Sequence, residues 1–392
     1  MSPEPRLTGR DIVCVGFADW DTELLTNQHH LMSRLAADNR VLFIESLGLR
    51  KPQLAGRDVK RIARRLRRGL QPPRLAPPGV HVLSPLVLPL HSQPAVRAVN
   101  ARLLPALVGR ATRRLNFQRP ILWGYVPQAE ALLDVLDPAL VVYHCVDDIA
   151  AQPGVDAGSF RAAERRFAAR ADLVLTSAPA LDARMRECND NVLFAPNVAD
   201  TTTFATALQD GPVDPAIAAL PGPVIAFTGA VVATKLDVGL IAELARSRPQ
   251  WSFALVGPTG MGDPSTDVSA LDAVANIHLL GARTHDALPA VLRGAAAGII
   301  PYASNQLTAS IFPMKVYEYL AAGLPVVATP LPALAGVDAV TTAADAPGMA
   351  AALDAALAAD SPEARAERSH AARAHSWDTR LAEIATAIAA LG

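Results

Sequence analysis

The sequence predicts an α/β protein built from two Rossmann-like domains. Short apolar segments of strand length alternate with stretches of helical periodicity along most of the 392 residues, which is typical of parallel βα units. The alternation breaks once, at residues 200–223, where three consecutive threonines, two glycines and several prolines indicate a linker. The length exceeds one ordinary domain, and a hydrophobic content of 51% can fill two cores.

The expected strands fall into two groups, one on each side of this linker. The first group comprises residues 11–18, 40–46, 121–125, 140–146, 172–177 and 192–195, with helices between them such as 24–37 and 160–171. The second group comprises residues 224–229, 253–257, 277–281, 298–302 and 325–329. The tail, residues 362–391, is rich in alanine and is expected to be helical. Ligands of such folds bind at the carboxyl ends of the strands, so a cleft between the two domains is the expected site.

Composition excludes several classes of protein. With 36 basic and 37 acidic residues the net charge is −1, which argues against a generally basic nucleic-acid binder. The three cysteines, Cys14, Cys145 and Cys188, are far apart, so neither a disulfide framework nor a zinc module is expected. Residues 1–10 are polar, and no run approaches the roughly 20 apolar residues of a spanning helix. We therefore expect a cytoplasmic protein in a reducing compartment.

Basic charge gathers in one segment of the first half. Residues 50–74 carry ten basic groups and one acid, Asp58. Within them, residues 57–70 place apolar side chains at helical spacing with Arg and Lys on the remaining face, which predicts a basic amphipathic helix. Such a helix either lies on the anionic inner face of the plasma membrane or packs its apolar stripe on its own domain. A role in binding nucleic acid is not expected, because no aromatic residues are interleaved with the charges.

The segment with the clearest chemistry is FPMKVYEYLAAGLPVVAT, residues 312–329. Pro313 can open a helix that places Lys315 and Glu318 on nearly one face and ends at Gly323. A lysine in the first turn suits a phosphate, because helix N-termini attract anions, and a glutamate one turn deeper can accept hydrogen bonds from a ribose diol. The alternative is a surface helix with an ordinary i, i+3 ion pair.

This segment resembles the donor-binding motif of GT-B-fold glycosyltransferases, in particular the retaining family 4 type. Further segments match the same family in order. They are the hinge-like Pro196–Asn197–Val198, GAVVATKLD at 229–237, NIHLLG at 276–281, Leu288–Pro289, Ile300–Pro301–Tyr302, and Ser376–Trp377–Asp378 at the start of the terminal helix. In the first half, WDTELLTNQH at 20–29, VLFIE at 41–45 and YHCVDD at 143–148 resemble a bacterial subgroup tied to cell-envelope polysaccharides.

The resemblance implies a GT-B fold with three parts: an acceptor domain over residues 1–200, a nucleotide-sugar donor domain over 201–375, and a C-terminal helix, 376–392, that crosses back to the acceptor domain. It also implies retention of configuration, no essential metal and no cofactor beyond the donor. Catalytic roles then fall to Lys235, Glu318 and Asp147. Donor-binding roles fall to the residues Gly16, Gly229, Lys235, Gly257, Ser310, Lys315 and Glu318.

One position departs from the family pattern. Many members carry a second glutamate eight positions before Glu318, where this chain has Ser310. A serine can hydrogen-bond a sugar hydroxyl but carries no charge, so Ser310, together with Thr308, is a substitute that leaves the donor sugar open. A non-catalytic sugar-binding or scaffolding relative is the alternative function.

The candidates of the first half each keep an alternative. Gly16 follows the first strand, where backbone approaches a ligand closely, but it also suits a plain strand-to-helix turn. His144 is interpreted as a buried core imidazole, and Asp147 as the closer match to a sugar-contacting histidine of relatives. Asp147 and Asp148 can instead cap a helix, and a metal-binding Asp pair is rejected because the tandem Rossmann pattern opposes that fold. The sequence therefore predicts a glycosyltransferase acting on a glycan or polyprenyl-linked acceptor.

Overall fold

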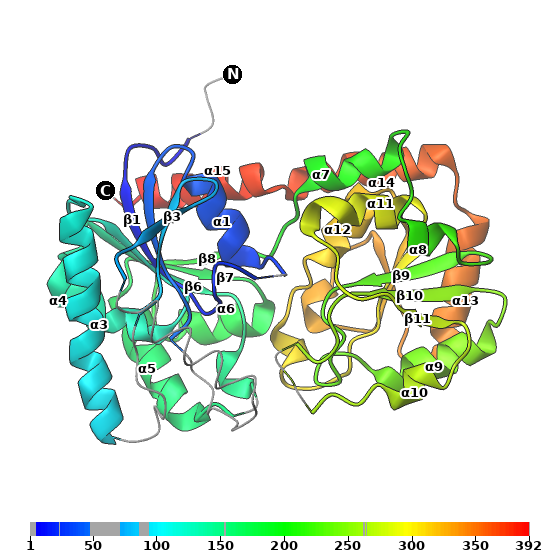
Figure 1. Cartoon of the computed structure of the whole chain (residues 1–392), viewed down its shortest axis with the longest axis horizontal. Helices are drawn as coiled ribbons and strands as arrows, with labels where there is room; N and C mark the ends of the chain where they lie inside the picture. The colour runs from blue at the N-terminus through cyan, green and yellow to red at the C-terminus, as the bar shows by residue number, and fades with distance from the viewer. Residues whose placement is uncertain are drawn as a thin grey trace. The chain divides into compact units, whose positions relative to one another are not determined.

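The chain divides into two compact units in the computed structural model (Figure 1). The structure describes residues 5–22, 24–47, 71–85, 94–152, 154–261, 263 and 265–391. The first unit comprises Met1–Pro196 with Leu381–Gly392, and the second comprises Asn197–Arg380. These limits lie within a few residues of the expected ones at 200 and 375. The basic helix predicted at 57–70 lies outside the described residues.

The first unit is built on an eight-stranded sheet of order β3-β4-β2-β1-β5-β6-β7-β8. Its strands are β1 Asp11–Val15, β2 Arg40–Ile44, β3 Arg74–Ala76, β4 Val80–Leu83, β5 Ile121–Gly124, β6 Leu140–Cys145, β7 Leu173–Thr176 and β8 Val192–Phe194. All pairings are parallel except that of the edge strand β3 with β4. The central strands are buried along nearly their whole length, as expected for a sheet covered by helices on both faces. Those helices are α1 Asn27–Leu35, α3 Pro94–Arg114, α4 Leu133–Leu136, α5 Ala157–Arg170 and α6 Pro179–Arg186.

The second unit holds a six-stranded, wholly parallel sheet of order β11-β10-β9-β12-β13-β14. Its strands are β9 Val224–Thr228, β10 Ser252–Val256, β11 Ile277–Leu279, β12 Ala297–Ile300, β13 Val326–Ala328 and β14 Val340–Thr342. The helices of this part are α7 Thr201–Ala205, α8 Pro215–Ala218, α9 Val238–Ser247, α10 Ser269–Asp272, α11 Leu288–Arg293, α12 Lys315–Ala321, α13 Ala346–Ala358 and α14 Pro362–Ala372. In Figure 1, α12 lies above this sheet, and α9 and α10 lie below it.

The strand expectations are confirmed at every predicted position, and three short strands, β3, β4 and β14, were not predicted.

The linker at 200–223 has no strand, but it is not featureless: α7 and α8 form there. In the segment between them, the carbonyls of Thr206 and Gln209 accept hydrogen bonds from the Arg293 guanidinium, at 2.8 and 3.0 Å. The tail forms α14 and then α15 Trp377–Ala389, which belongs to the first unit from Leu381 on. A helix long and apolar enough to cross a membrane is not found among the described residues.

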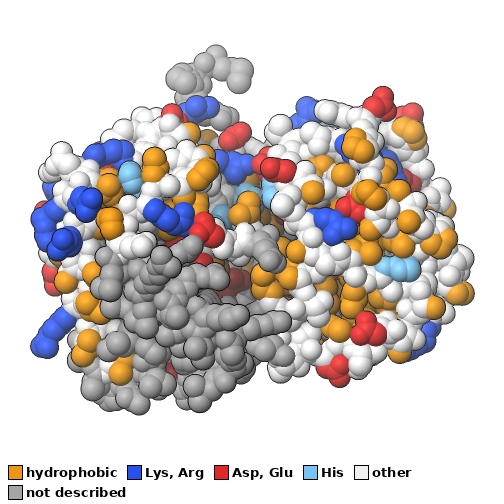
Figure 2. Space-filling model, viewed as in Figure 1, with side chains coloured by type: hydrophobic (Ala, Val, Ile, Leu, Met, Phe, Trp, Pro, Cys, Tyr) orange, Lys and Arg blue, Asp and Glu red, His pale blue; other side chains and the backbone are white. Residues whose placement is uncertain are grey.

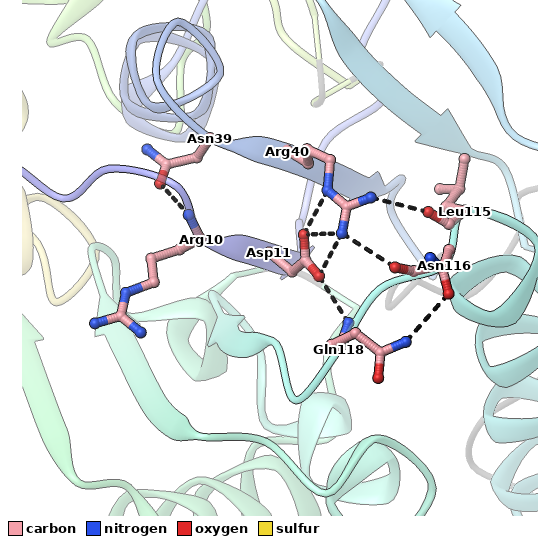
Figure 3. A network of polar contacts seen from close by, with 7 residues as sticks. All are labelled: Arg10, Asp11, Asn39, Arg40, Leu115, Asn116 and Gln118. Atoms are coloured by element: carbon pink, nitrogen blue, oxygen red, sulfur yellow. Dashed lines mark hydrogen bonds and ion pairs between the residues drawn. The ribbon is translucent and has the colours of Figure 1, made fainter.

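An ion pair closes the amino-terminal edge of the first sheet (Figure 3). The Arg40 guanidinium, at the start of β2, donates a hydrogen bond of 2.7 Å to each carboxylate oxygen of Asp11, at the start of β1. It also donates to the carbonyls of Leu115 and Asn116, just after α3, and the backbone N–H of Gln118 donates to Asp11 at 2.7 Å. This edge lies opposite the carboxyl ends of the strands, so the network is structural.

Helix α12 is attached to the second sheet through Tyr319, which is fully buried. Its hydroxyl accepts a hydrogen bond from the backbone N–H of Thr228, at the end of β9, at 2.7 Å. Its ring lies against Gly298 of β12, where an added Cβ would come within 2.3 Å of the ring. Glycine at 298 is therefore required for the helix to sit this close to the sheet.

Replacing Gly298 with alanine should destabilise the second unit by about 1–3 kcal/mol or more, because the methyl group overpacks against the Tyr319 ring. The matched control is Gly239→Ala in α9, where the nearest atom to an added Cβ is 3.5 Å away. Alanine there should be neutral or stabilising by up to about 1 kcal/mol. Urea unfolding followed by circular dichroism measures both. Equal stability of the two variants would contradict this account of Gly298.

Candidate functional site

Two glycines bring the ends of β9 and β10 together in the second unit. Gly229 follows β9 with φ of +129°, a backbone conformation that side chains rarely adopt. Its N–H donates to the carbonyl of Val256 at 2.9 Å. At Gly257, an added Cβ would lie 1.9 Å from the Gly229 carbonyl oxygen. The contact with Gly229 thus accounts for glycine at 257 without a ligand, and the predicted donor-binding role of Gly257 stays a prediction.

Lys315 points to this turn from the start of α12. Its ammonium donates to the Tyr302 hydroxyl at 2.9 Å and lies 5.2 Å from the ring centres of both Phe227 and Tyr302. A Cβ on Gly229 would be 3.6 Å from the Lys315 Nζ. Burial opposes the charge, but the electrostatic influence of Tyr302, Tyr319 and Glu318 and the Tyr302 hydrogen bond outweigh it and raise the pKa of Lys315. The ammonium therefore stays charged at neutral pH.

Lys235 lies on the loop between β9 and α9. Its carbonyl accepts from the N–H of Ala303 at 2.8 Å, and Leu236 forms an antiparallel bridge with Tyr302. Asp237 caps α9 by accepting from the N–H of Leu240 at 2.9 Å. The backbone of Lys235 is thus fixed on both sides. Its side chain is partly exposed and has no hydrogen bond or ion pair with any residue that the structure describes.

Glu318 lies one turn after Lys315 and is partly exposed. Burial raises the pKa of its carboxyl group, and the electrostatic influence of the neighbouring Lys315 and His285 lowers it by less. Its carboxylate accepts no hydrogen bond from the described part of the chain. The ordinary i, i+3 ion pair is not formed between these two described residues, and the Lys315 ammonium donates to the Tyr302 hydroxyl. Glu318 thus offers unused acceptors beside a held ammonium.

The two candidates that replace the usual glutamate differ from each other. Thr308 is fully buried, and its hydroxyl is used inside its own turn, where it donates to the carbonyl of Ala303 at 2.5 Å. Ser310 closes the same turn and is 5% exposed. Its hydroxyl has no hydrogen-bond partner among the residues that the structure describes. Of the two, only Ser310 keeps a hydroxyl for a ligand.

The candidates of the first unit have partners within that unit. Gly16 is packed against Phe43 and Gln28, which would come within 2.4 and 2.7 Å of an added Cβ, so packing alone accounts for glycine there. His144 is buried in β6 and stacks on Tyr125 with ring centres 4.8 Å apart, as expected for a core imidazole. Asp147 follows β6 and is partly exposed.

Asp148 does not cap a helix through its side chain. It belongs to a cluster of four charges, in which it and Glu164 are buried and Arg161 and Arg184 are partly exposed. Arg161 donates to Asp148 at 2.5 Å, Arg184 lies 3.3 Å from Glu164, and the Tyr143 hydroxyl donates to Glu164 at 2.8 Å. The Asp148 and Glu164 side chains are 3% and 1% exposed, so each carboxylate depends on the arginines for compensation.

The structure thus brings together Gly229, Gly257, Lys315 and Tyr302. Lys235 lies on the loop that pairs with Tyr302, and Glu318 lies on α12 with Lys315. Gly16 and Asp147 lie in the other unit. Tyr302 and His285 were not predicted as site residues. Tyr302 belongs to the Ile300–Pro301–Tyr302 motif. Its contact with Lys315 joins residues that are 13 apart in the sequence, and periodicity does not reveal such a contact. Groups of three or more His, Cys, Asp or Glu side chains placed to hold a metal ion are not found in the described ranges.

Comparison with known proteins fits this geometry. Residues 222–359 match the family described as glycosyl transferases group 1. The matched residues lie within the second unit. The chain is 30% identical over 244 residues to a protein of Bacillus subtilis named as a teichuronic acid biosynthesis glycosyltransferase, TuaH. That match covers 59% of this chain and 60% of the relative's length.

Solved structures show the fold over nearly the whole chain. Sucrose-phosphate synthase of Thermosynechococcus elongatus is similar with a TM-score of 0.67 at 14% identity, covering 97% of this chain and 99% of that one. Anabaena HepE in complex with UDP-glucose gives 0.66 at 14% identity, covering 97% and 100%. The chain therefore has the GT-B fold, with a Rossmann-like sheet in each unit.

Replacing Glu318 with glutamine should stabilise the protein more at neutral than at acidic pH. Burial raises the pKa of Glu318 in the folded state above its value in the unfolded chain. At a pH between the pKa values of the unfolded and folded states, the folded state binds more protons. The free energy of unfolding therefore falls as the pH rises through the folded pKa, and a glutamine, which does not titrate, does not cause this loss. Urea unfolding at about pH 5 and about pH 8 measures the difference. An identical difference at both pH values, or the same pattern in the exposed control Glu243→Gln, would contradict it.

Proposed function

We propose that the protein transfers a sugar from a nucleotide-diphosphate sugar to a glycan or lipid-linked acceptor, with retention of anomeric configuration, in cell-envelope polysaccharide synthesis. The observation that carries the proposal is the pair of Lys315, held as a cation beside Gly229, and Glu318, whose carboxylate has no hydrogen-bond partner among the described residues. The names of the relatives support it: TuaH is named for teichuronic acid biosynthesis, and HepE was solved with UDP-glucose. Uracil is therefore the base we propose for the donor nucleotide.

The proposed reaction exchanges one bond at the anomeric carbon of the donor sugar. The bond from that carbon to the diphosphate oxygen breaks, and a bond to the acceptor hydroxyl oxygen forms on the same face. The acceptor proton passes to the departing diphosphate, which carries away the electron pair. Negative charge grows on the phosphate in the transition state, and ammonium groups already in place stabilise it without reorganisation. Lys315 and Lys235 supply that charge.

The remaining residues of the proposal bind or orient the donor. Glu318 accepts hydrogen bonds from the ribose diol, and Ser310 donates to a sugar hydroxyl in place of the usual glutamate. Asp147 keeps a catalytic role toward the transferred sugar, and Gly16 a donor-binding role, on the family resemblance alone. We propose that the reaction needs neither a metal nor a cofactor, since the lysines provide the positive charge. A non-catalytic sugar-binding relative is the alternative, because Ser310 carries no charge.

Calorimetric titration with UDP-, GDP- and ADP-sugars tests the donor site. One donor type, expected to be the UDP-sugar, should bind, and Glu318→Gln should weaken its affinity about 10- to 100-fold, because a hydrogen bond to a charged group contributes about 1.5–3 kcal/mol. Glu243→Gln, on the exposed side of α9, should bind as the wild type does. Absence of binding to every nucleotide by the folded protein would refute a donor site here. Binding without turnover on any acceptor would favour the non-catalytic alternative.

We also propose a cytoplasmic location with peripheral contact to an anionic membrane. The basic segment 57–70 lies outside the described residues, but α3 offers a second basic surface. Its Arg102, Arg110, Arg113 and Arg114 are exposed, and none forms an ion pair with a described residue. The helix contains no acidic residue and no aromatic one, which suits a membrane surface better than a nucleic acid. Figure 2 shows basic side chains on the side of the first unit where Figure 1 draws α3.

Replacing Arg110 and Arg113 together with glutamine should weaken binding to vesicles that contain phosphatidylserine about 30-fold. Each basic group near such a surface contributes about 1 kcal/mol, and the effect should shrink as salt is added. The matched control is Arg246→Gln with Arg373→Gln, two exposed arginines of the second unit. Sedimentation with vesicles measures both variants. Equal binding of the two double variants, or equal binding to neutral vesicles, would contradict a role of α3.

A further inference from the structure

We propose that Tyr302 is the positioning residue of the donor site: its backbone fixes the Lys235 loop while its hydroxyl holds the Lys315 ammonium. This inference rests on the proposed function for its consequence, but its structural part stands on contacts within the second unit. Tyr302 follows β12, is 6% exposed, and touches elements that carry both lysines.

The backbone around Tyr302 is anchored on two sides. On one side, the N–H of Asp237 donates to the Pro301 carbonyl at 2.9 Å, and the N–H of Ala303 donates to the Lys235 carbonyl at 2.8 Å. These bonds enclose the antiparallel bridge between Leu236 and Tyr302. The loop of Lys235 is therefore paired to the Tyr302 segment like a short strand.

On the other side, Thr329 ties the same segment to the end of β13. Its hydroxyl donates to the Tyr302 carbonyl at 2.7 Å, and its N–H donates to the Ile300 carbonyl at 3.0 Å. Thr329 itself is buried. The backbone of Tyr302 is thus held in place, and its side chain extends from a fixed position.

The Tyr302 side chain uses that fixed point to hold Lys315. Its hydroxyl accepts one of the three ammonium protons at 2.9 Å, and its ring and that of Phe227 each lie 5.2 Å from Nζ. An ammonium has three donors, so two remain for an anionic ligand. Lysine is flexible, and holding its ammonium before a diphosphate arrives lowers the entropy lost on binding.

Tyrosine also keeps the held ammonium charged. Burial of Lys315 favours the neutral amine, whereas the neighbouring Tyr302 and its hydrogen bond raise the pKa of the ammonium. Phenylalanine at 302 would retain the ring and the backbone pairing but would lose the acceptor oxygen. Lys315 would then lose both its anchor and part of the stabilisation of its charge.

Tyr302→Phe tests this directly by two measurements. The first is independent of any ligand: the chain has four lysines, so labelled lysine Cε groups give four NMR signals, of which Lys315→Arg identifies one. In Tyr302→Phe the pKa of Lys315 should fall. The second is calorimetry, where UDP affinity should fall about tenfold at neutral pH, or about 1.4 kcal/mol, and further at alkaline pH, with uridine affinity unchanged.

Tyr317→Phe is the matched control, since Tyr317 lies on the same helix but stacks on Phe312 and His375 and makes no contact with Lys315. It should leave both readouts as in the wild type. An unchanged pKa of Lys315 with unchanged UDP affinity, or an equal loss of UDP and uridine affinity, would overturn the role of Tyr302. A lowered pKa in a protein that binds no nucleotide would uphold the positioning of Lys315 and refute the proposed function instead.

Discussion

The attachment of α12 to the end of β9 is the constraint on which the site in the second unit depends. The Tyr319 hydroxyl accepts the N–H of Thr228, and the next residue of the chain is Gly229, where the backbone turns with positive φ. Burial raises the pKa of Tyr319 to about 12, so the hydroxyl stays neutral while it serves as an acceptor. The contacts of Tyr319 therefore join the helix that carries Lys315 and Glu318 to the strand end that precedes the turn facing Lys315.

Much of the fold could be predicted from the sequence, because buried parallel strands are continuous apolar runs that stand out between amphipathic helices. The strands β3, β4 and β14 could not, because they do not stand out as such runs: prolines surround β3 and β4, and β14 ends in two exposed threonines. The region 200–223 was interpreted as a linker because glycine and proline break its periodicity. The segment between its two short helices is bound by the Arg293 guanidinium, which lies 84 to 87 residues further along the chain and could not be read from the local sequence.

Only part of the site could be predicted, because the sequence reveals spacing within a helix but not tertiary contacts. Lys315 and Glu318 share a helix, so their spacing was readable, although the helix begins at Lys315 and not at Pro313. The absence of an ion pair between them, and the choice of Tyr302 as the partner of Lys315, depend on tertiary contacts. Gly16 and Gly257 show the limit of motif reasoning: both positions need glycine to avoid a clash with neighbouring protein atoms, whether or not a ligand lies nearby.

The charge cluster of Asp148, Arg161, Glu164 and Arg184 limits how this protein can diverge or be redesigned. Two cations and two anions cancel inside the first unit, and each arginine serves both carboxylates. Losing either arginine leaves the buried carboxylates with too little compensating charge, whereas exchanging an opposite pair for apolar residues of similar volume keeps neutrality. We therefore expect these four positions to change together in evolution or design. Paired replacements of one cation and one anion keep the protein stable, whereas a variant with only one replacement is destabilised.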